Sequence, residues 1–109
     1  MELDQYDLAV DWLSTAIRVN PNHFRAHANL GVALQTLRRY DEAVAAYRAA
    51  LALNPDDAAT HANLGRSLLS LGRDPEGLRS LQTAVRLDAS LEEEREILTR
   101  RLASGFRLD

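Results

Sequence analysis

The chain has 109 residues and a formal net charge of −3, a length that suffices for one small domain with a single core. Apolar residues make up 46% of the sequence and aromatic residues only 6%. Alanine and leucine supply most of the apolar content, which favours closely packed helices. The sequence contains no cysteine, which excludes disulfides, zinc-thiolate sites and thiol nucleophiles.

Apolar residues recur at steps of three and four along six segments, and this spacing is typical of amphipathic helices. The predicted helices cover residues 6–19, 24–37, 40–53, 58–71, 74–87 and 92–104. Asn20-Pro21 ends the first segment and Asn54-Pro55 ends the third, because proline cannot continue a helix. Gly72 ends the fourth segment, because glycine readily adopts the left-handed conformation that often follows the last residue of a helix.

The last two predicted helices carry signals at their ends. Asp74 stands directly before a proline, which predicts an N-cap followed by proline at the first helical position. Residues Ser90 to Glu93 match a capping box, in which serine and glutamate each satisfy a free backbone donor. Gly105 predicts a helix stop, and Phe106 is expected to fold back as one apolar residue.

The chain is a tandem repeat with a period of 34 residues. The pentapeptide His-Ala-Asn-Leu-Gly at 27–31 returns at 61–65, and two complete units span 24–57 and 58–91. The units also agree at Leu34/Leu68, Leu37/Leu71, Arg39/Arg73, Glu42/Glu76, Ala50/Ala84 and Leu53/Leu87. Residues 1–23 match the second half of a unit.

Each unit has leucine and glycine at adjacent positions in its first helix. In the better-matching unit a tyrosine opens the second helix and is followed by small residues and then by Asn-Pro. The residues concerned are Leu30, Gly31, Tyr40, Ala43, Tyr47, Ala50 and Pro55 in one unit and Leu64, Gly65, Leu81 and Ala84 in the next. This pattern resembles the tetratricopeptide repeat (TPR) family. The resemblance implies an all-α solenoid of antiparallel helix pairs, folded as one domain. Asp74, Gly77 and Ala89 depart from the pattern, and Gly77 is expected to cost about 1 kcal/mol of helix stability relative to alanine.

The two ends of the array are expected to differ. Residues 92–109 form a capping helix and tail, in which Leu98 and Leu102 continue the core-facing stripe while the other faces are charged. Residues 1–23 supply the second helix of a repeat without the first, so one apolar face lacks a partner in this chain. Either the chain belongs to a longer array or another molecule covers that face. The predicted oligomer interface comprises Ala9, Trp12, Leu13 and Ala16.

The resemblance implies a binding function, because first helices of the family line a concave groove that accepts a peptide. The groove residues expected by position are Arg25, Asn29, Val32, Gln35, Thr36, Ala59, Asn63, Arg66, Leu69 and Ser70. Asn29 and Asn63 are similar to the asparagine ladder of O-linked N-acetylglucosamine transferases, because an amide can pair with any peptide backbone. The alternative is that asparagine simply tolerates solvent there.

The chaperone-binding carboxylate clamp of the family is not expected. Its five positions fall on Ala28, Val32, Asn63, Glu93 and Ile97, and only the asparagine matches. Arg66 and Arg100 remain open to two interpretations. Together with Arg25 they favour an acidic or C-terminal ligand group, or they pair with Glu93 or Glu96 at a gain of about 0 to 1 kcal/mol.

No catalytic, metal-binding or cofactor-binding pattern is present in the sequence. His27 and His61 lie a whole repeat apart, about 10 Å in a stack of helices, which is too far for one metal ion. Both are expected to pack as rings, and His23 is expected to be a loop residue. Gly31 and Gly65 belong to no phosphate-binding loop.

These observations predict a non-enzymatic scaffold that binds a peptide segment of another protein. The alternatives are a self-assembling protein that oligomerises, for example as a homodimer, through its uncovered N-terminal helix, and the TPR part of a larger enzyme. The scattered basic residues, all arginine, argue against nucleic acid as a partner. Neither a signal peptide nor a membrane-spanning run is visible, so a cytoplasmic location is expected.

Overall fold

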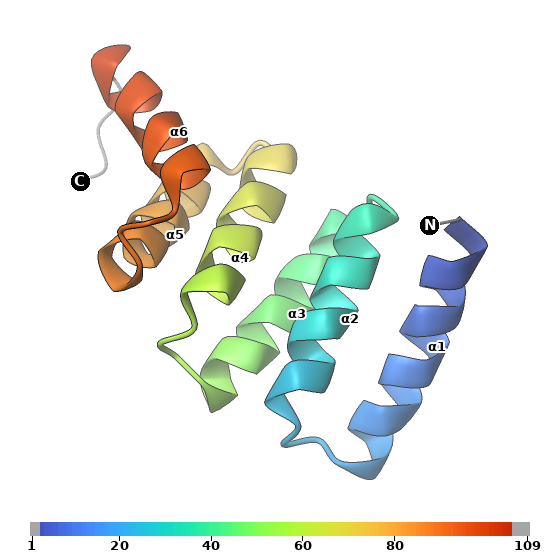
Figure 1. Cartoon of the computed structure of the whole chain (residues 1–109). Helices are drawn as coiled ribbons and strands as arrows, with labels where there is room; N and C mark the ends of the chain where they lie inside the picture. The colour runs from blue at the N-terminus through green and yellow to red at the C-terminus, as the bar shows by residue number, and fades with distance from the viewer. Residues whose placement is uncertain (1–2, 106–109) are drawn as a thin grey trace. The chain divides into compact units, whose positions relative to one another are not determined.

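The computed structural model describes residues 3–105, which form six α-helices and no β-strand (Figure 1). The helices are α1 (Leu3–Val19), α2 (Phe24–Thr36), α3 (Tyr40–Leu53), α4 (Ala58–Ser70), α5 (Asp74–Leu87) and α6 (Glu92–Ala103). Each predicted helix is present, and the boundaries agree within three residues. The prediction of an all-α solenoid of TPR type is therefore confirmed.

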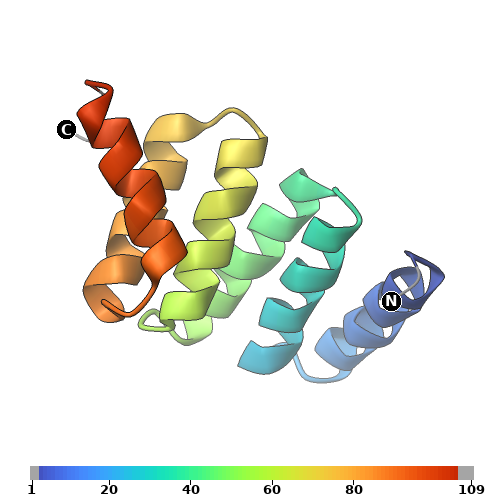
Figure 2. The ribbon, with the colours of Figure 1, turned by 45° about the horizontal axis from the view of Figure 1, so that its top comes forward.

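The chain divides into two compact units, one ending at Pro55 and the other beginning at Asp56. In the first unit, α2 packs against both α1 and α3. In the second unit, α5 packs against both α4 and α6 (Figure 2). Each unit thus contains one complete pair of helices and one additional helix beside it.

The complete pairs meet where the first helix carries glycine. A Cβ built on Gly31 would lie 2.6 and 2.9 Å from ring carbons of Tyr47, which is fully buried. In the second unit, a Cβ on Gly65 would lie 2.8 Å from both the carbonyl oxygen of Gly77 and a carbon of Leu81. Glycine at these positions therefore sets how closely the two helices approach.

The expected role of Gly77 needs correction. Its low helix propensity suggested only a local weakness, but a Cβ at this position would meet the backbone oxygen of Gly65 at 2.9 Å and the side chain of Leu69 at 2.9 Å. The residue is buried. Gly77 is thus required by the contact between α4 and α5, and the cost in helix propensity accompanies that contact.

Helix capping differs from the sequence prediction at three positions. His23 is the N-cap of α2 rather than a plain loop residue, because its Nδ1 accepts from the backbone N–H of Ala26 at 3.0 Å. The predicted capping box at the start of α6 is wrong, since the Ser90 hydroxyl donates to Asp88 at 2.6 Å and Leu91 is the N-cap. Asp74 is the first residue of α5, and the N-cap is the residue before it.

The turns inside the two complete repeats share a left-handed residue. Gly72 has φ +78° and ends α4 as predicted, whereas the equivalent position in the first unit holds Arg38 at φ 61°. The hydrogen bonds after α2, Arg39 N–H to Leu34 O and Arg38 N–H to Gln35 O, form a Schellman motif. The first unit therefore carries a side chain in a conformation that glycine adopts without cost.

The core-facing leucines of the C-terminal helix α6 are more exposed than expected. Leu98 is half-buried, but Leu102 is 53% exposed, although the equivalent Leu34 and Leu68 are 3% and 1% exposed. The second helix of a repeat covers the two core leucines, and α6 has no such partner among residues 3–105. Gly105 has φ +92°, and Phe106 lies outside the described residues.

Replacing Gly77 by alanine is expected to destabilise the protein, although alanine is the better helix former by about 1 kcal/mol. The added methyl group must displace the backbone of Gly65 or the side chain of Leu69, and overpacking of this kind costs about 1 to 3 kcal/mol. Urea denaturation followed by circular dichroism measures the difference. A variant with a higher midpoint than the parent would show that the helices separate freely at this contact.

The exchange of Arg38 for glycine is expected to stabilise the first unit by about 1 kcal/mol, because a left-handed conformation is costly for a residue with a Cβ. The reciprocal change Gly72→Arg is the control and should destabilise by a similar amount, since open space surrounds that glycine and only its φ matters. Thermal unfolding of both variants checks the pair. Equal melting temperatures for all three chains would contradict it.

Candidate functional site

The candidate binding residues of the first unit lie on α2. Arg25, Asn29 and Val32 are exposed, and Val32 retains 43% of its accessible surface. The guanidinium carbon of Arg25 lies 5.8 Å from the ring centre of Phe24. These three side chains, spaced by four and three residues, lie on one face of α2.

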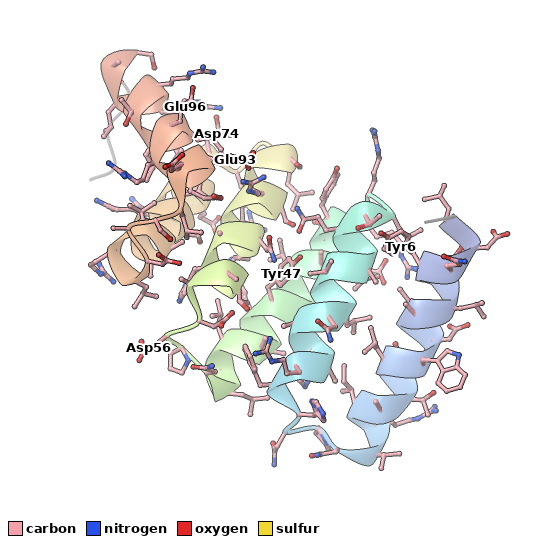
Figure 3. The ribbon with its side chains drawn as sticks, in the orientation of Figure 1. Tyr6, Tyr47, Asp56, Asp74, Glu93 and Glu96 are labelled. Carbon is pink, nitrogen blue, oxygen red and sulfur yellow. The ribbon has the colours of Figure 1, made fainter. Side chains whose placement is uncertain are left out.

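The other two residues predicted on α2 have partners within the unit. The Tyr47 hydroxyl donates to Oε1 of Gln35 at 2.6 Å, which ties α3 to α2 (Figure 3). Burial raises the pKa of Tyr47, so the hydroxyl remains protonated and can donate. The Thr36 hydroxyl donates to the carbonyl oxygen of Val32 at 2.9 Å. Gln35 therefore contributes to the contact between α2 and α3.

The second unit presents its predicted residues on α4. Ala59 and Ser70 are exposed, whereas Asn63 and Leu69 are half-buried. Leu69 packs against α5, because a Cβ on Gly77 would touch it. The Ser70 hydroxyl donates to the carbonyl oxygen of Arg66 at 3.1 Å. Leu69 thus takes part in the contact with α5, and Ser70 bonds within its own helix. Ala59 and Asn63 form no side-chain hydrogen bond within residues 3–105.

Arg66 joins α4 to α6 through two ion pairs. Its Nη2 lies 2.5 Å from Glu93 and 2.7 Å from Glu94, and both carboxylates come from the first turn of α6 (Figure 3 labels Glu93). The side chain of Glu94 is only 7% exposed, against 35% for Arg66 and 78% for Glu93. The guanidinium holds the pKa of Glu93 below its ordinary value.

This arrangement decides between the two interpretations of the arginines. Arg66 pairs with Glu93 and Arg100 pairs with Glu96 at 2.6 Å, as the ion-pair alternative predicted. A further pair, Arg101 to Asp74 at 2.7 Å, joins α6 to α5. The charge of Arg66 is already balanced inside the unit, so Arg66 is no free receptor for an acidic ligand group.

The exposed face of α6 carries a shallow hollow of about 190 Å³ that the sequence analysis did not select. It is lined by Glu93, Glu96, Ile97 and Arg100. Glu93, Ile97 and Arg100 occupy the repeat positions of Ala59, Asn63 and Arg66. Extending the groove positions by one more period would have identified them. Half-buried Ile97 stands where the preceding repeats carry asparagine, so the asparagine series stops at the second unit.

Asn29 and Asn63 differ from their polar neighbours. Within residues 3–105 neither amide forms a hydrogen bond, whereas Gln35, Thr36, Arg66 and Ser70 are all engaged in bonds within their units. The two asparagines occupy the same position of successive repeats. Each therefore retains a donor and an acceptor for a ligand.

The face of α1 that was expected to be bare is covered only in part. Ala9 and Leu13 are half-buried, while Ala16 is exposed and Trp12 is 76% exposed. The sequence analysis missed Leu8, which is 57% exposed beside Trp12. The signal for it was present, because the two complete repeats have glutamate at the position of Leu8.

The described residues offer no cluster of three side chains suited to hold a metal ion. His27 instead contacts the carbonyl oxygen of Pro21 through Nε2 at 2.8 Å and so fastens the turn before α2. No helix among residues 3–105 has the length and apolar content to cross a membrane.

Comparison with known families and structures identifies the repeat. A model described as tetratricopeptide repeat matches residues 24–57, and a second, described as TPR repeat, matches residues 1–37. No curated protein sequence matches the chain.

Three of the similar solved structures represent the comparison. The AMB-1 form of MamA has 38% identity and a TM-score of 0.75, over 77% of this chain and 49% of that chain. An RS-1 MamA double mutant has 25% identity and a TM-score of 0.86, over 95% of this chain and 58% of that chain. The first TPR of Spaghetti (RPAP3), bound to an HSP90 peptide, has 19% identity and a TM-score of 0.86, over 93% and 80%, and shows likeness of fold. The chain thus spans about half the length of the MamA chains that it matches.

Removal of the Arg66 charge is expected to loosen α6. In Arg66→Met, buried Glu94 loses its partner, and breaking a buried pair from one side should destabilise by about 2 to 4 kcal/mol. The control Arg100→Met breaks an exposed pair, 78% and 60% exposed, and should cost less than about 0.5 kcal/mol. Chemical denaturation gives both values. A double variant with Glu94→Met should recover most of the loss, and equal effects of the two single changes would contradict the assignment.

Proposed function

Because the chain belongs to the tetratricopeptide repeat family, we propose that it is a non-enzymatic interaction module that binds an extended peptide through Asn29 and Asn63. The observation that carries the proposal is the state of these two amides. They stand at one position of two successive repeats and form no hydrogen bond within residues 3–105. An extended peptide backbone offers the alternating donors and acceptors that such amides match.

The side chains near the amides define the chemistry of the ligand. On α2, exposed Val32 and Arg25 flank Asn29, and on α4 exposed Ala59 precedes Asn63 by one turn. The surface around each amide is thus polar and weakly apolar. Such a surface suits recognition of the peptide main chain with little preference for side chains, similar to the asparagine ladder of O-linked N-acetylglucosamine transferases.

An acidic C-terminus is a poor candidate for the ligand. Arg66 is neutralised by Glu93 and Glu94, and the clamp positions on α6 hold Glu93 and Ile97. At Arg66 a ligand carboxylate would meet the two carboxylates that already pair with this arginine, and they would repel it. The peptide proposed here therefore binds through its interior backbone.

Self-association is a second candidate function, and the exposure of α1 favours it. Trp12 is 76% and Leu8 57% exposed on the same helix, and adjacent exposed apolar side chains of this size mark an interaction surface. This function uses a different helix from the peptide site, so the two are compatible.

Replacing both Asn29 and Asn63 by alanine is expected to weaken peptide binding by about 1 to 3 kcal/mol, because each lost hydrogen bond contributes about 0.5 to 1.5 kcal/mol. The probe is a peptide selected on the chain from a displayed random library, and isothermal titration measures its affinity. The control is the pair Thr36→Ala and Ser70→Ala, whose hydroxyls already bond to their own helices. Unchanged affinity in the asparagine variant, with helicity intact, would remove the backbone-recognition proposal.

A further inference from the structure

The outer face of α1 departs from the repeat pattern toward apolar residues. At the position of Leu8 the complete repeats have Glu42 and Glu76, and Glu42 is paired with Arg39 at 2.7 Å in the first repeat. In α1 the position of that arginine holds Gln5, so the ion pair is replaced by glutamine and leucine.

Trp12 shows the same trend on the next turn. The equivalent residues are Ala46, which is 6% exposed, and Ser80, which is half-buried. The only tryptophan of the chain has therefore been placed at a position that is otherwise small, and it is left largely in solvent. A solvated surface would not favour this exchange, because exposed tryptophan contributes free energy chiefly when it becomes buried in an interface.

These residues form a continuous stripe. Leu8, Trp12 and Ala16 are spaced by four residues, so they lie one above another on one face of the helix, and all three are exposed. A shallow hollow of about 260 Å³, lined by Asp11, Trp12 and Thr15, borders the stripe. The surface thus combines a projecting indole with a depression beside it.

Charged residues run along one side of the stripe. Asp4, Asp11 and Arg18 are spaced by seven residues and so share one flank of the helix. Asp4 and Arg18 lie about 21 Å apart along the axis, at about 1.5 Å per residue. Arg18 bonds only to the Thr15 hydroxyl, at 3.3 Å, and neither Asp4 nor Arg18 forms an ion pair within residues 3–105. The flank is acidic at its N-terminal end and basic at its C-terminal end.

We propose that the stripe binds the same stripe of a second copy, with the two α1 helices antiparallel and related by a two-fold axis close to Asp11 and Trp12. This inference rests on self-association, the second candidate function, and specifies its geometry. In antiparallel helices equal flanks face each other, so Asp4 of each copy meets Arg18 of the other. The two tryptophans lie beside the axis, and Leu8 of each copy packs near Ala16 of the other.

The charges favour the antiparallel over the parallel orientation. Parallel pairing would bring Asp4, Asp11 and Arg18 each against its own equivalent, which gives like charges at three levels. The antiparallel pairing gives two opposite-charge contacts and one contact of like charge, between the two Asp11 side chains at the axis. That single repulsion makes Asp11 a specific test of the geometry.

Helix α6 of another copy is a poor occupant of the stripe, although it corresponds to the first helix of a repeat. At the position of Gly31 and Gly65 it carries Thr99. A Cβ at either glycine already falls within 3.0 Å of the second helix, so threonine in α6 prevents the close approach of a complete repeat. The charged residues Arg95 and Glu96 occupy the adjacent turn.

The first experiment measures self-association of the whole chain by sedimentation equilibrium from low to high micromolar concentration. The single tryptophan gives a second readout, because its fluorescence should shift to the blue as dimer forms and Trp12 becomes buried. Trp12→Ala should weaken dimerisation by about thirtyfold or more, whereas the control Leu53→Ala, which removes an exposed leucine from α3, should have little effect. A parent chain that remains monomeric would overturn both self-association and the geometry.

The second experiment tests the orientation by charge exchange. Asp4→Arg and Arg18→Asp should each weaken the dimer by about tenfold, since each creates two like-charge contacts, and the double variant should recover the parent affinity. Asp11→Asn should strengthen the dimer severalfold. If the chain dimerises through Trp12 but the double variant fails to recover, self-association stands and the antiparallel register is wrong.

Discussion

The close approach of two helices at a glycine is the contact on which each unit of this protein depends. Without a Cβ at Gly31, the ring of Tyr47 fills the space between α2 and α3. In the second unit Gly65 and Gly77 bring the two backbones themselves together, and Leu81 takes the place of the tyrosine. Helices that approach this closely pack their small and apolar faces at interior density, which leaves their polar faces for binding.

This contact also explains which candidate residues are available for a ligand. Gln35 and Leu69 lie at groove positions on the first helices, yet both contact the second helices. Gln35 accepts a hydrogen bond from the Tyr47 hydroxyl, and Leu69 packs against Gly77. Asn29 and Asn63 lie farther toward the N-terminus of their helices and keep their amides unbonded within the described residues. Repeat position alone does not distinguish these cases, because the identity of the residue on the opposing helix decides them.

Helices α1 and α6 each lack the other helix of a complete repeat among the described residues, and they differ in how their side chains are covered. Helix α6 is joined to α4 by the pair of Arg66 with Glu94 and to α5 by the pair of Arg101 with Asp74, and its Leu102 stays exposed. Helix α1 leaves Leu8 and Trp12 exposed, and none of its residues is fully buried. A polar terminal helix prevents further helices from stacking on the end of a solenoid, whereas an exposed stripe that contains tryptophan favours such stacking. The proposed self-association therefore involves α1 and not α6.

The repeat period, the all-α class and the six helices were determined by the sequence, because a 34-residue repeat with helical spacing leaves one architecture that buries its leucines. The same pattern correctly singled out Gly72 as a helix stop. The sequence signal failed at Ser90, which bonds to Asp88 and does not cap the helix. His23 lies in the loop before α2 as predicted, but its role as the N-cap of α2 was not predicted. Tertiary contacts alone decided that Arg66 is neutralised by a buried glutamate 28 residues away and that Gly77 is a packing requirement. Local propensity acts over a few residues, whereas these outcomes depend on the distance between helices, which only the folded chain establishes.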